Sequence, residues 1–149
     1  MEQLFSRRAR LPVEERVPIA AIMFDLDRFS ELNNRNGHQA GDDVLRTFGG
    51  ILRARMRSTD LVARFGGEEF AAILFRATLD DAVRIADQVR EQLAATTIVG
   101  SGGEELTATV SAGCAAVRPE QESPDDLLRA ADVALYMAKR AGRDRVCAA

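Results

Sequence analysis

The sequence predicts an α+β domain of ferredoxin-like plan, in which helices flank a central and mostly antiparallel sheet. Residues 19–24 form a short, continuously apolar run that ends abruptly in acidic residues, as in a strand buried on both faces. Residues 44–56 repeat apolar side chains every three or four positions, which is typical of an amphipathic helix. Along the chain these patterns give the order β-α-α-β-β-α-β-α. A chain of 149 residues that is 46% hydrophobic can bury one sizeable core.

The chain is expected to consist of a short lead-in and one domain. Residues 1–18 are polar, rich in arginine and contain two prolines, so we expect them to precede the core, and the domain to span residues 19–149. Residues 61–65 and 70–75 have the composition of strands, and the Gly-Gly pair between them indicates a hairpin.

Polar residues mark three helix starts. A Gly-Asp-Asp sequence at residues 41–43 is predicted to place acidic side chains in the first turn of a helix, where the helix dipole favours them. Thr78 is predicted to cap a second helix through a variant of the capping box. Ser123 and the proline after it begin the last helix, and Gly142 suits its end. Residues 106–117 are predicted to form a strand.

Composition excludes several classes of function. The formal net charge of −3 and an isoelectric point near 5.3 argue against the broad basic face that non-specific nucleic-acid binding needs. Every apolar run is too short to cross a bilayer, so we expect a cytoplasmic domain without membrane contact of its own. Cys114 and Cys147 accompany a single histidine, which indicates neither a disulfide framework nor a zinc site, and we expect both thiols to be reduced, with Cys114 buried.

Four carboxylates are expected to meet at one edge of the sheet. Asp25 and Asp27 end the buried strand, and Glu68 and Glu69 follow the hairpin turn on a neighbouring strand. Two such charges about 4 Å apart repel by roughly 4 kcal/mol at an effective dielectric near 20, so the cluster needs a cation. Oxygen ligands without histidine or cysteine favour Mg²⁺ or Mn²⁺, and Mg²⁺ keeps positions for the phosphates of a nucleotide. For Asp27, a solvated turn residue is the alternative.

The tetrapeptide Gly-Gly-Glu-Glu occurs twice, at residues 66–69 and 102–105, so it cannot carry an assignment by itself. Apolar runs with strand composition flank the first copy on both sides. The second copy is predicted to be a mobile hairpin loop with no partner carboxylate nearby. Function is therefore assigned only to the first copy.

A resemblance to one protein family covers residues 24 to about 145. The sequence Arg-Phe-Gly-Gly-Glu-Glu-Phe at residues 64–70 resembles the signature of the GGDEF family, the diguanylate cyclases that condense two GTP molecules into cyclic di-GMP. Further matches lie in residues 24–45, at Ser111-x-Gly113 and in residues 131–143. The resemblance implies the palm-like fold of nucleotidyl cyclases, with Mg²⁺ or Mn²⁺ as cofactor.

The resemblance also implies a role for each matching residue. The catalytic and metal-binding residues would be Asp25, the Leu26 carbonyl, Glu68 and Glu69, with Glu68 helping to activate the 3′-hydroxyl of GTP. The substrate-binding residues would be Asn33 and Asp42 for the guanine edge, Phe29 and Leu45 for its pocket, Gly66 and Gly67 for close backbone approach, and Lys139 and Arg143 for the terminal phosphates.

Two residue pairs have competing interpretations. Lys139 is the only lysine in the chain, and its i, i+4 spacing from Arg143 predicts one helix face directed at phosphates, whereas helix-dipole stabilisation is the alternative. Arg57 and Asp60 resemble the family's R-x-x-D inhibitory site, where product binds back, and a solvated helix end is the alternative. Gln88 stands where another arginine often completes such a site, which leaves the strength of inhibition open.

The resemblance implies partners as well. Because one domain holds one GTP, catalysis needs a homodimer in which two sites face each other with two-fold symmetry. An upstream sensory domain or protein is expected to drive that dimerisation. The alternative function is a non-catalytic receptor or regulatory domain that binds cyclic di-GMP or GTP.

Overall fold

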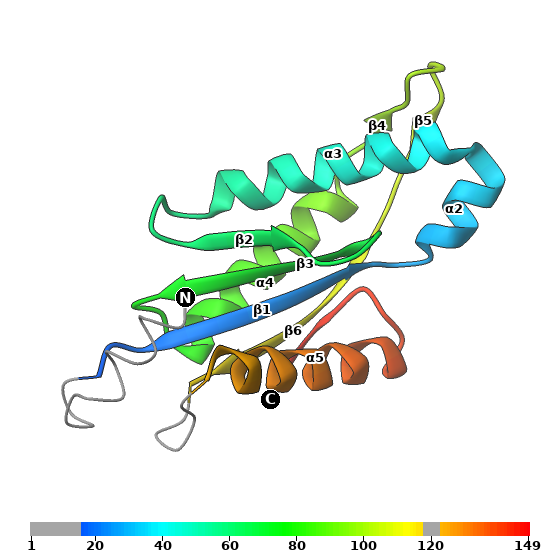
Figure 1. Ribbon diagram of the computed structural model, residues 1–149. Helices are drawn as coiled ribbons and strands as arrows, with labels where there is room; N and C mark the ends of the chain where they lie inside the picture. Colours follow the sequence, from blue (N-terminus) through cyan, green and yellow to red (C-terminus); the bar gives the residue numbers. More distant parts are fainter. Residues whose placement is uncertain (1–15, 118–122) are drawn as a thin grey trace.

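The computed structural model describes residues 16–117 and 123–149, which form a central sheet with helices on both faces (Figure 1). The main sheet has the strand order β2-β3-β1-β6-β7, and a small hairpin forms a second sheet, β4-β5. The elements are β1 (Ile19–Leu26), α2 (Phe29–Asn36), α3 (His38–Arg55), β2 (Leu61–Arg64), β3 (Glu69–Phe75), α4 (Leu79–Ala94), β4 (Ile98–Val99), β5 (Glu105–Leu106), β6 (Val110–Ala116), α5 (Pro124–Arg140) and β7 (Val146–Ala148). The predicted α+β fold is confirmed, while the predicted lead-in lies outside the described residues except for 16–18.

β1 lies at the centre of the sheet, which explains its continuous apolar run. It pairs antiparallel with β3 on one side and β6 on the other, and all eight of its residues are buried. Ile22 and Phe24 pack in the core beneath α3 and α4, where Phe48 meets Phe24 edge to face. Ala21 and Met23 point the other way, into the core beneath α5. Because helices cover both faces, neither set of alternate side chains reaches water.

The strand prediction for residues 106–117 is wrong in its first part. Leu106 pairs with Ile98 in the small hairpin, whereas β6 begins only at Val110 and pairs with β1. The chain therefore leaves one sheet before it enters the other, and residues 107–109 belong to neither. β7 was not predicted; it pairs parallel with β6, although the sheet is otherwise antiparallel.

The first long helix begins earlier than predicted. α3 starts at His38, so Asp42 and Asp43 lie in its second turn and not in its first. Gly37 separates α3 from α2 with a φ of 89°, a backbone conformation that favours glycine. The polar residues after Gly37 are helical without an apolar repeat, which is why the apolar pattern marks the helix only from Val44 onward.

The other two predicted helix starts are confirmed. Thr78 accepts a hydrogen bond from the Asp81 amide while the Asp81 side chain accepts from the Thr78 amide, which makes a capping box. Ser123 accepts from the Asp126 amide at the start of α5. Within the described ranges, no helix combines the length and apolarity needed to span a bilayer.

Close packing constrains two residues of β6, Gly113 and Cys114. α5 crosses Gly113 so closely that a Cβ there would lie 2.1 Å from the Leu135 nitrogen and 2.2 Å from the Ala131 oxygen. Cys114 is fully buried, as predicted, and burial raises the pKa of its thiol to about 12, which keeps it protonated and unreactive.

Candidate functional site

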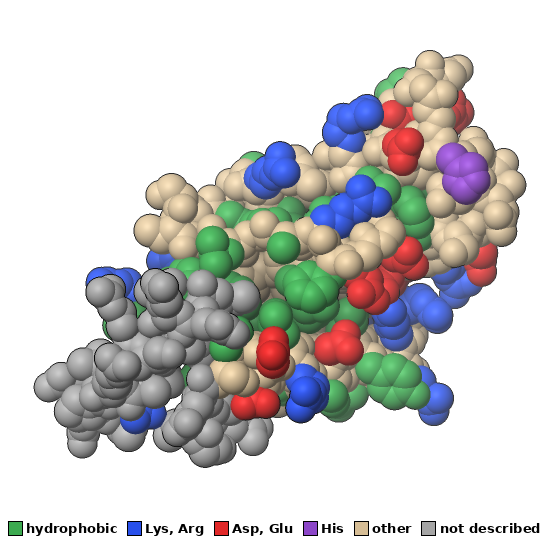
Figure 2. Space-filling model, viewed as in Figure 1, with side chains coloured by type: hydrophobic (Ala, Val, Ile, Leu, Met, Phe, Trp, Pro, Cys, Tyr) green, Lys and Arg blue, Asp and Glu red, His purple; other side chains and the backbone are tan. Residues whose placement is uncertain are grey.

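A hollow of about 230 Å³ opens where β1 ends, beside the start of α2 and the end of α5. Figure 2 shows acidic and basic side chains side by side on this face, between the regions of α3 and α5 in Figure 1. The hollow is lined by Asp25, Leu26, Asp27, Arg28, Phe29, Ser30, Glu31, Glu68, Lys139 and Arg143. We call it the acidic hollow.

Asp25 brings acidic groups of two strands together. Its backbone lies opposite Glu69 in the antiparallel register of β1 and β3, and the next residue, Leu26, donates its N–H to the Glu68 carbonyl at 3.1 Å. The Asp25 carboxylate is nearly buried, with 6% of the residue exposed, and Lys139 Nζ lies 2.5 Å from its Oδ2. The sheet register therefore places the strand end and the hairpin at one edge, as the sequence suggested.

Negative charge is crowded around Glu69. Burial and the charge of Asp25 raise the pKa of Glu69, Asp132 and Glu68 raise it further, and Lys139 acts in the opposite direction. Asp132 was missing from the predicted site. Its sequence signal was its position on α5, seven residues or about two turns before Lys139, which places both on one side of the helix.

The donors around the acidic hollow suit a hard divalent cation. Asp25, Glu68, Glu69 and the Leu26 carbonyl offer oxygen ligands, and the described lining of the hollow includes no histidine or cysteine. Within residues 16–117 and 123–149, no three acidic, histidine or cysteine side chains are already arranged as a metal site. The ammonium of Lys139 lies where it partly neutralises the cluster. The chemistry of this donor set therefore fits Mg²⁺ or Mn²⁺.

Lys139 and Arg143 both line the acidic hollow, but the predicted shared helix face is wrong. α5 ends at Arg140, and Gly142 turns the chain with a φ of 125°. Arg143 follows with a φ of 65°, a left-handed conformation that costs a residue with a Cβ about 1–2 kcal/mol. A strained turn after the helix, and not helical spacing, brings Arg143 to the hollow.

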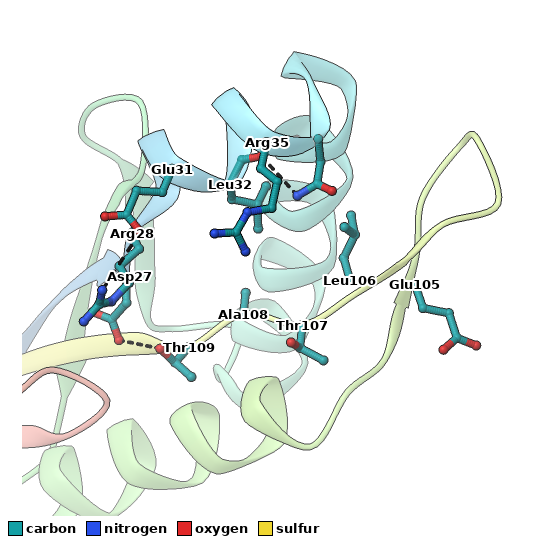
Figure 3. Close-up of a pocket in the computed structure, with 11 residues that line it drawn as sticks. Asp27, Arg28, Glu31, Leu32, Arg35, Glu105, Leu106, Thr107, Ala108 and Thr109 are labelled. Atoms are coloured by element: carbon teal, nitrogen blue, oxygen red, sulfur yellow. Dashed lines mark hydrogen bonds and ion pairs between the residues drawn. The ribbon is translucent and has the colours of Figure 1, made fainter.

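Asp27 has structural partners, so it is not a solvated turn residue. Its carboxylate accepts hydrogen bonds from Thr109 Oγ1 at 2.7 Å, Ser111 Oγ at 2.6 Å and the Asp144 amide at 3.0 Å. Figure 3 shows the bond to Thr109 on the wall of a neighbouring hollow of about 440 Å³, between α2 and residues 105–109. With three donors already bound, the carboxylate has little capacity left for a metal ion.

The residues predicted to bind guanine lie in different surroundings. Asp42 and Leu45 line an open hollow of about 610 Å³ between α3 and the β2–β3 hairpin. Asn33 lies on α2, where its Oδ1 is buried without a hydrogen-bond partner in the described part of the chain. Gly41 makes room for it, since a Cβ at that position would lie 1.8 Å from the Asn33 oxygen and 3.0 Å from the Phe29 ring. An unpaired buried amide oxygen is a group that a ligand donor can satisfy.

Asp43, the neighbour of Asp42, binds Ser101, the residue directly before the second Gly-Gly-Glu-Glu copy. Its carboxylate accepts from the Ser101 amide at 2.9 Å and from Ser101 Oγ at 3.1 Å. The bond from the Ser101 amide holds the pKa of Asp43 below its ordinary value. A partner carboxylate therefore does lie near the second copy, contrary to the prediction, but it anchors the hairpin.

Arg64 orders the first copy from within the hairpin. Its Nε and Nη2 donate to the carbonyls of Gly66 and Gly67 at 3.2 and 2.8 Å, and Phe65 donates to the Glu69 carbonyl at 2.8 Å. Arg64 also lines the larger hollow beside Asp42. The predicted site does not include Arg64, because sequence spacing does not reveal that its side chain folds back on the turn.

Arg57 and Asp60 are bonded to each other at the turn between α3 and β2. Asp60 accepts from the Arg57 amide at 2.9 Å and from Arg57 Nη2 at 3.2 Å, and Arg57 also donates to the Phe75 carbonyl. The Asp60 side chain is only 2% exposed, compared with 53% for Arg57. Gln88 bonds to a different arginine, Arg55, at 3.1 Å.

Known proteins match this chain over most of its length. The family model described as "Diguanylate cyclase, GGDEF domain" matches residues 1–145. The response regulator PleD of Caulobacter vibrioides is 40% identical over 130 residues, which are 87% of this chain and 29% of PleD. This chain thus spans less than a third of that relative's length.

Solved structures agree closely with the fold. The GGDEF domain of DgcB from Caulobacter crescentus, solved in complex with c-di-GMP, superposes with a TM-score of 0.90 at 30% identity, covering 99% of this chain and 84% of that one. The active GGEEF domain of a diguanylate cyclase from Vibrio cholerae gives 0.87 at 31% identity, covering 98% and 89%. The family match over nearly the whole sequence and these superpositions show that the chain belongs to the GGDEF domain family of diguanylate cyclases.

Proposed function

We propose that this domain is a diguanylate cyclase, which condenses two GTP molecules into cyclic di-GMP and two pyrophosphates. The observation that carries the proposal is the meeting of Asp25, Glu68 and Glu69 at one sheet edge, with Lys139 and Arg143 in the same hollow. Carboxylates that can hold divalent ions, beside cations that can hold phosphates, are the two parts that phosphoryl transfer needs.

Each part of the substrate would meet a different group of residues. Asp25, the Leu26 carbonyl, Glu68 and Glu69 would hold Mg²⁺ or Mn²⁺, which when bound stabilises the charge on the attacking oxygen and the leaving pyrophosphate. Lys139 and Arg143 would bind the terminal phosphates. Asn33 and Asp42 would bind the guanine edge beside Phe29 and Leu45, with Asp42 accepting from its N–H groups. Gly66 and Gly67 would let the backbone approach the nucleotide.

In the reaction, the 3′-oxygen of each GTP forms a bond to the α-phosphorus of the other, and the two bonds from these phosphorus atoms to pyrophosphate break, which closes the ring and releases two pyrophosphates. Glu68 accepts the proton that the 3′-hydroxyl loses. One domain holds one GTP, so the reaction requires a homodimer with two-fold symmetry, in the cytoplasm where GTP is available. Segments outside this chain, such as an upstream sensory domain, would control how often two domains meet.

Arg57 and Asp60 would bind the product as an inhibitory site. Product would have to replace the bond between the two side chains, and the Asp60 carboxylate is almost fully covered. Gln88 is engaged with Arg55 and adds no charge. We therefore expect product inhibition to be weaker than at a site with free arginine and aspartate side chains.

The test is to incubate the protein with GTP and Mg²⁺ over a range of protein concentrations and to detect cyclic di-GMP by mass spectrometry. Specific activity should rise with protein concentration, because two half-sites must meet. Binding of GTP or cyclic di-GMP without any product at high concentration would contradict catalysis and leave a receptor or regulatory domain. ATP serves as the substrate control, because adenine lacks the N1–H group from which Asp42 would accept a hydrogen bond.

A further inference from the structure

Asp27 ties three separate segments of the chain together. Its backbone ends the β1 region, where its N–H donates to the Thr109 carbonyl at 2.9 Å. Its side chain accepts from Thr109 and Ser111 of the β6 segment, and from the backbone N–H of Asp144 in the turn after α5. The bonds to Thr109 and Ser111 reinforce a segment that β1 already holds by strand pairing, so the bond to Asp144 is the one that adds a new connection.

The turn that Asp27 holds has an unfavourable backbone. Arg143 and Asp144 both have positive φ values, 65° and 45°, although neither is glycine. Aspartate tolerates this conformation better than arginine does. Such a conformation persists only where surrounding bonds fix it, and residues held in this way are concentrated at functional sites.

The bonds that hold the turn come from several sides. The Arg143 amide donates to the Ala138 carbonyl at 3.0 Å, which completes the end of α5. The Asp144 carboxylate accepts from Arg90 Nη1 of α4 at 3.1 Å, and the Asp144 amide donates to Asp27. Asp27 therefore fixes the peptide that directly follows Arg143, in the acidic hollow that both residues line.

We propose that Asp27 is a positioning residue: by accepting the Asp144 amide, it holds Arg143 in the conformation that directs its guanidinium to the terminal phosphates of the nucleotide. The proposal rests on the proposed function, since it assumes that the acidic hollow binds a nucleoside triphosphate. It gives the second aspartate of Asp-Leu-Asp a role different from that of Asp25. Asp25 faces the carboxylates and Lys139, whereas Asp27 acts through Arg143.

The test compares binding of 3′-deoxy-GTP, which cannot react, with binding of GMP, which lacks the terminal phosphates. Both are titrated with Mg²⁺ into the wild-type protein and into Asp27→Ala, Arg143→Ala and the double variant. Asp27→Ala removes the acceptor of the Asp144 amide and should lower the preference for the triphosphate about tenfold, the size of one charge-assisted contact, and Arg143→Ala should do the same. The double variant should lose no more than either single variant, because both changes remove one interaction.

Thr109→Val is the matched control. It removes a bond to the same Asp27 oxygen but leaves the Asp144 amide in place, so the triphosphate preference should stay within about twofold of the wild-type value. If Asp27→Ala does not fold, Asp27→Glu keeps the charge and displaces the oxygens, and it should show the same selective loss.

Three outcomes would overturn the positioning role. In the first, Asp27→Ala weakens binding of both nucleotides equally; in the second, its effect adds fully to that of Arg143→Ala. In the third, the wild-type protein prefers the triphosphate and Asp27→Ala keeps that preference. If the wild-type protein itself has no preference for the triphosphate, the proposed nucleotide site fails, and the positioning role fails with it.

Discussion

The two Gly-Gly-Glu-Glu copies have the same residues, but the local structure requires a glycine in only one copy. In the copy at 102–105, Gly103 adopts a φ of 86° and donates to the Gly100 carbonyl at 2.9 Å, so the turn itself requires glycine. In the copy at 66–69, neither glycine has a positive φ, and a Cβ at Gly67 would meet nothing within 4 Å. The fold thus explains Gly103 of the second copy but neither glycine of the first.

The glutamates differ in the same way. Glu104 folds against its own loop, close enough that a Cβ at Gly100 would lie 2.1 Å from its Oε1. Glu69 lies opposite Asp25, in a cluster whose charges raise its pKa. Where local structure accounts for a motif, no external ligand is needed. Where it does not, the requirement comes from something that binds, and in the first copy we infer that this is the nucleotide.

The largest difference between the copies should appear in catalysis. Glu68→Gln changes a proposed metal ligand and removes the group proposed to accept the 3′-hydroxyl proton, so cyclic di-GMP production should fall about 10³-fold. Glu104→Gln, at the same position of the second copy, should leave the rate within about twofold. Initial rates with GTP and Mg²⁺ at matched protein concentrations measure both. Equal losses in the two variants would contradict the assignment of function to the first copy.

Replacing the second glycine of each copy by alanine should affect activity in the first copy and stability in the second. Gly67→Ala should leave the melting temperature unchanged, since the backbone is ordinary and the space is open, but lower the rate about 10- to 100-fold through the displaced nucleotide. Gly103→Ala should do the reverse, costing about 1 kcal/mol of unfolding free energy and leaving the rate per folded molecule unchanged. A Gly67→Ala variant with full activity would show that no ligand approaches this backbone.

The fold followed from the sequence wherever the signal was local. The apolar run of β1, the cap at Thr78 and the cap at Ser123 each depend on neighbours in the chain, and each is confirmed. β7 and the early start of α3 were missed because three residues of strand and a polar helical turn carry no periodic pattern. Tertiary contacts decide such elements.

The same distinction between local signals and long-range contacts applies to the candidate site. That Asp25 and the hairpin glutamates share one edge could be deduced, because a buried strand and its neighbouring hairpin set the register. The hydrogen bond from the Asp144 amide to Asp27 could not be deduced from the sequence. It joins residues 117 positions apart through a backbone amide that any residue except proline would provide. Arg143 lines the acidic hollow together with Lys139, but the helical spacing that predicts a shared face does not apply beyond Arg140.

The smallest expected difference concerns stability and pH. The pKa of Glu69 is raised in the folded state, so its contribution to stability is fully present below its unfolded pKa, near 4.5, and is lost as pH rises through the folded value. Without metal at pH 7, Glu69→Gln should therefore unfold at higher urea, with a gain of about 0.5 to 1 kcal/mol, since Glu69 is partly open to water and its repulsion is screened.

The gain of Glu69→Gln should vanish near pH 4, where the wild-type carboxylate is largely protonated, and should shrink when Mg²⁺ is added, because only the wild-type cluster gains a full set of cation contacts. Glu105→Gln, the equivalent change in the second copy, should show neither dependence. If Glu69→Gln were instead destabilising at pH 7 without metal, the folded protein would need the Glu69 charge for its own structure, and the contrast between the two copies would lose its physical basis.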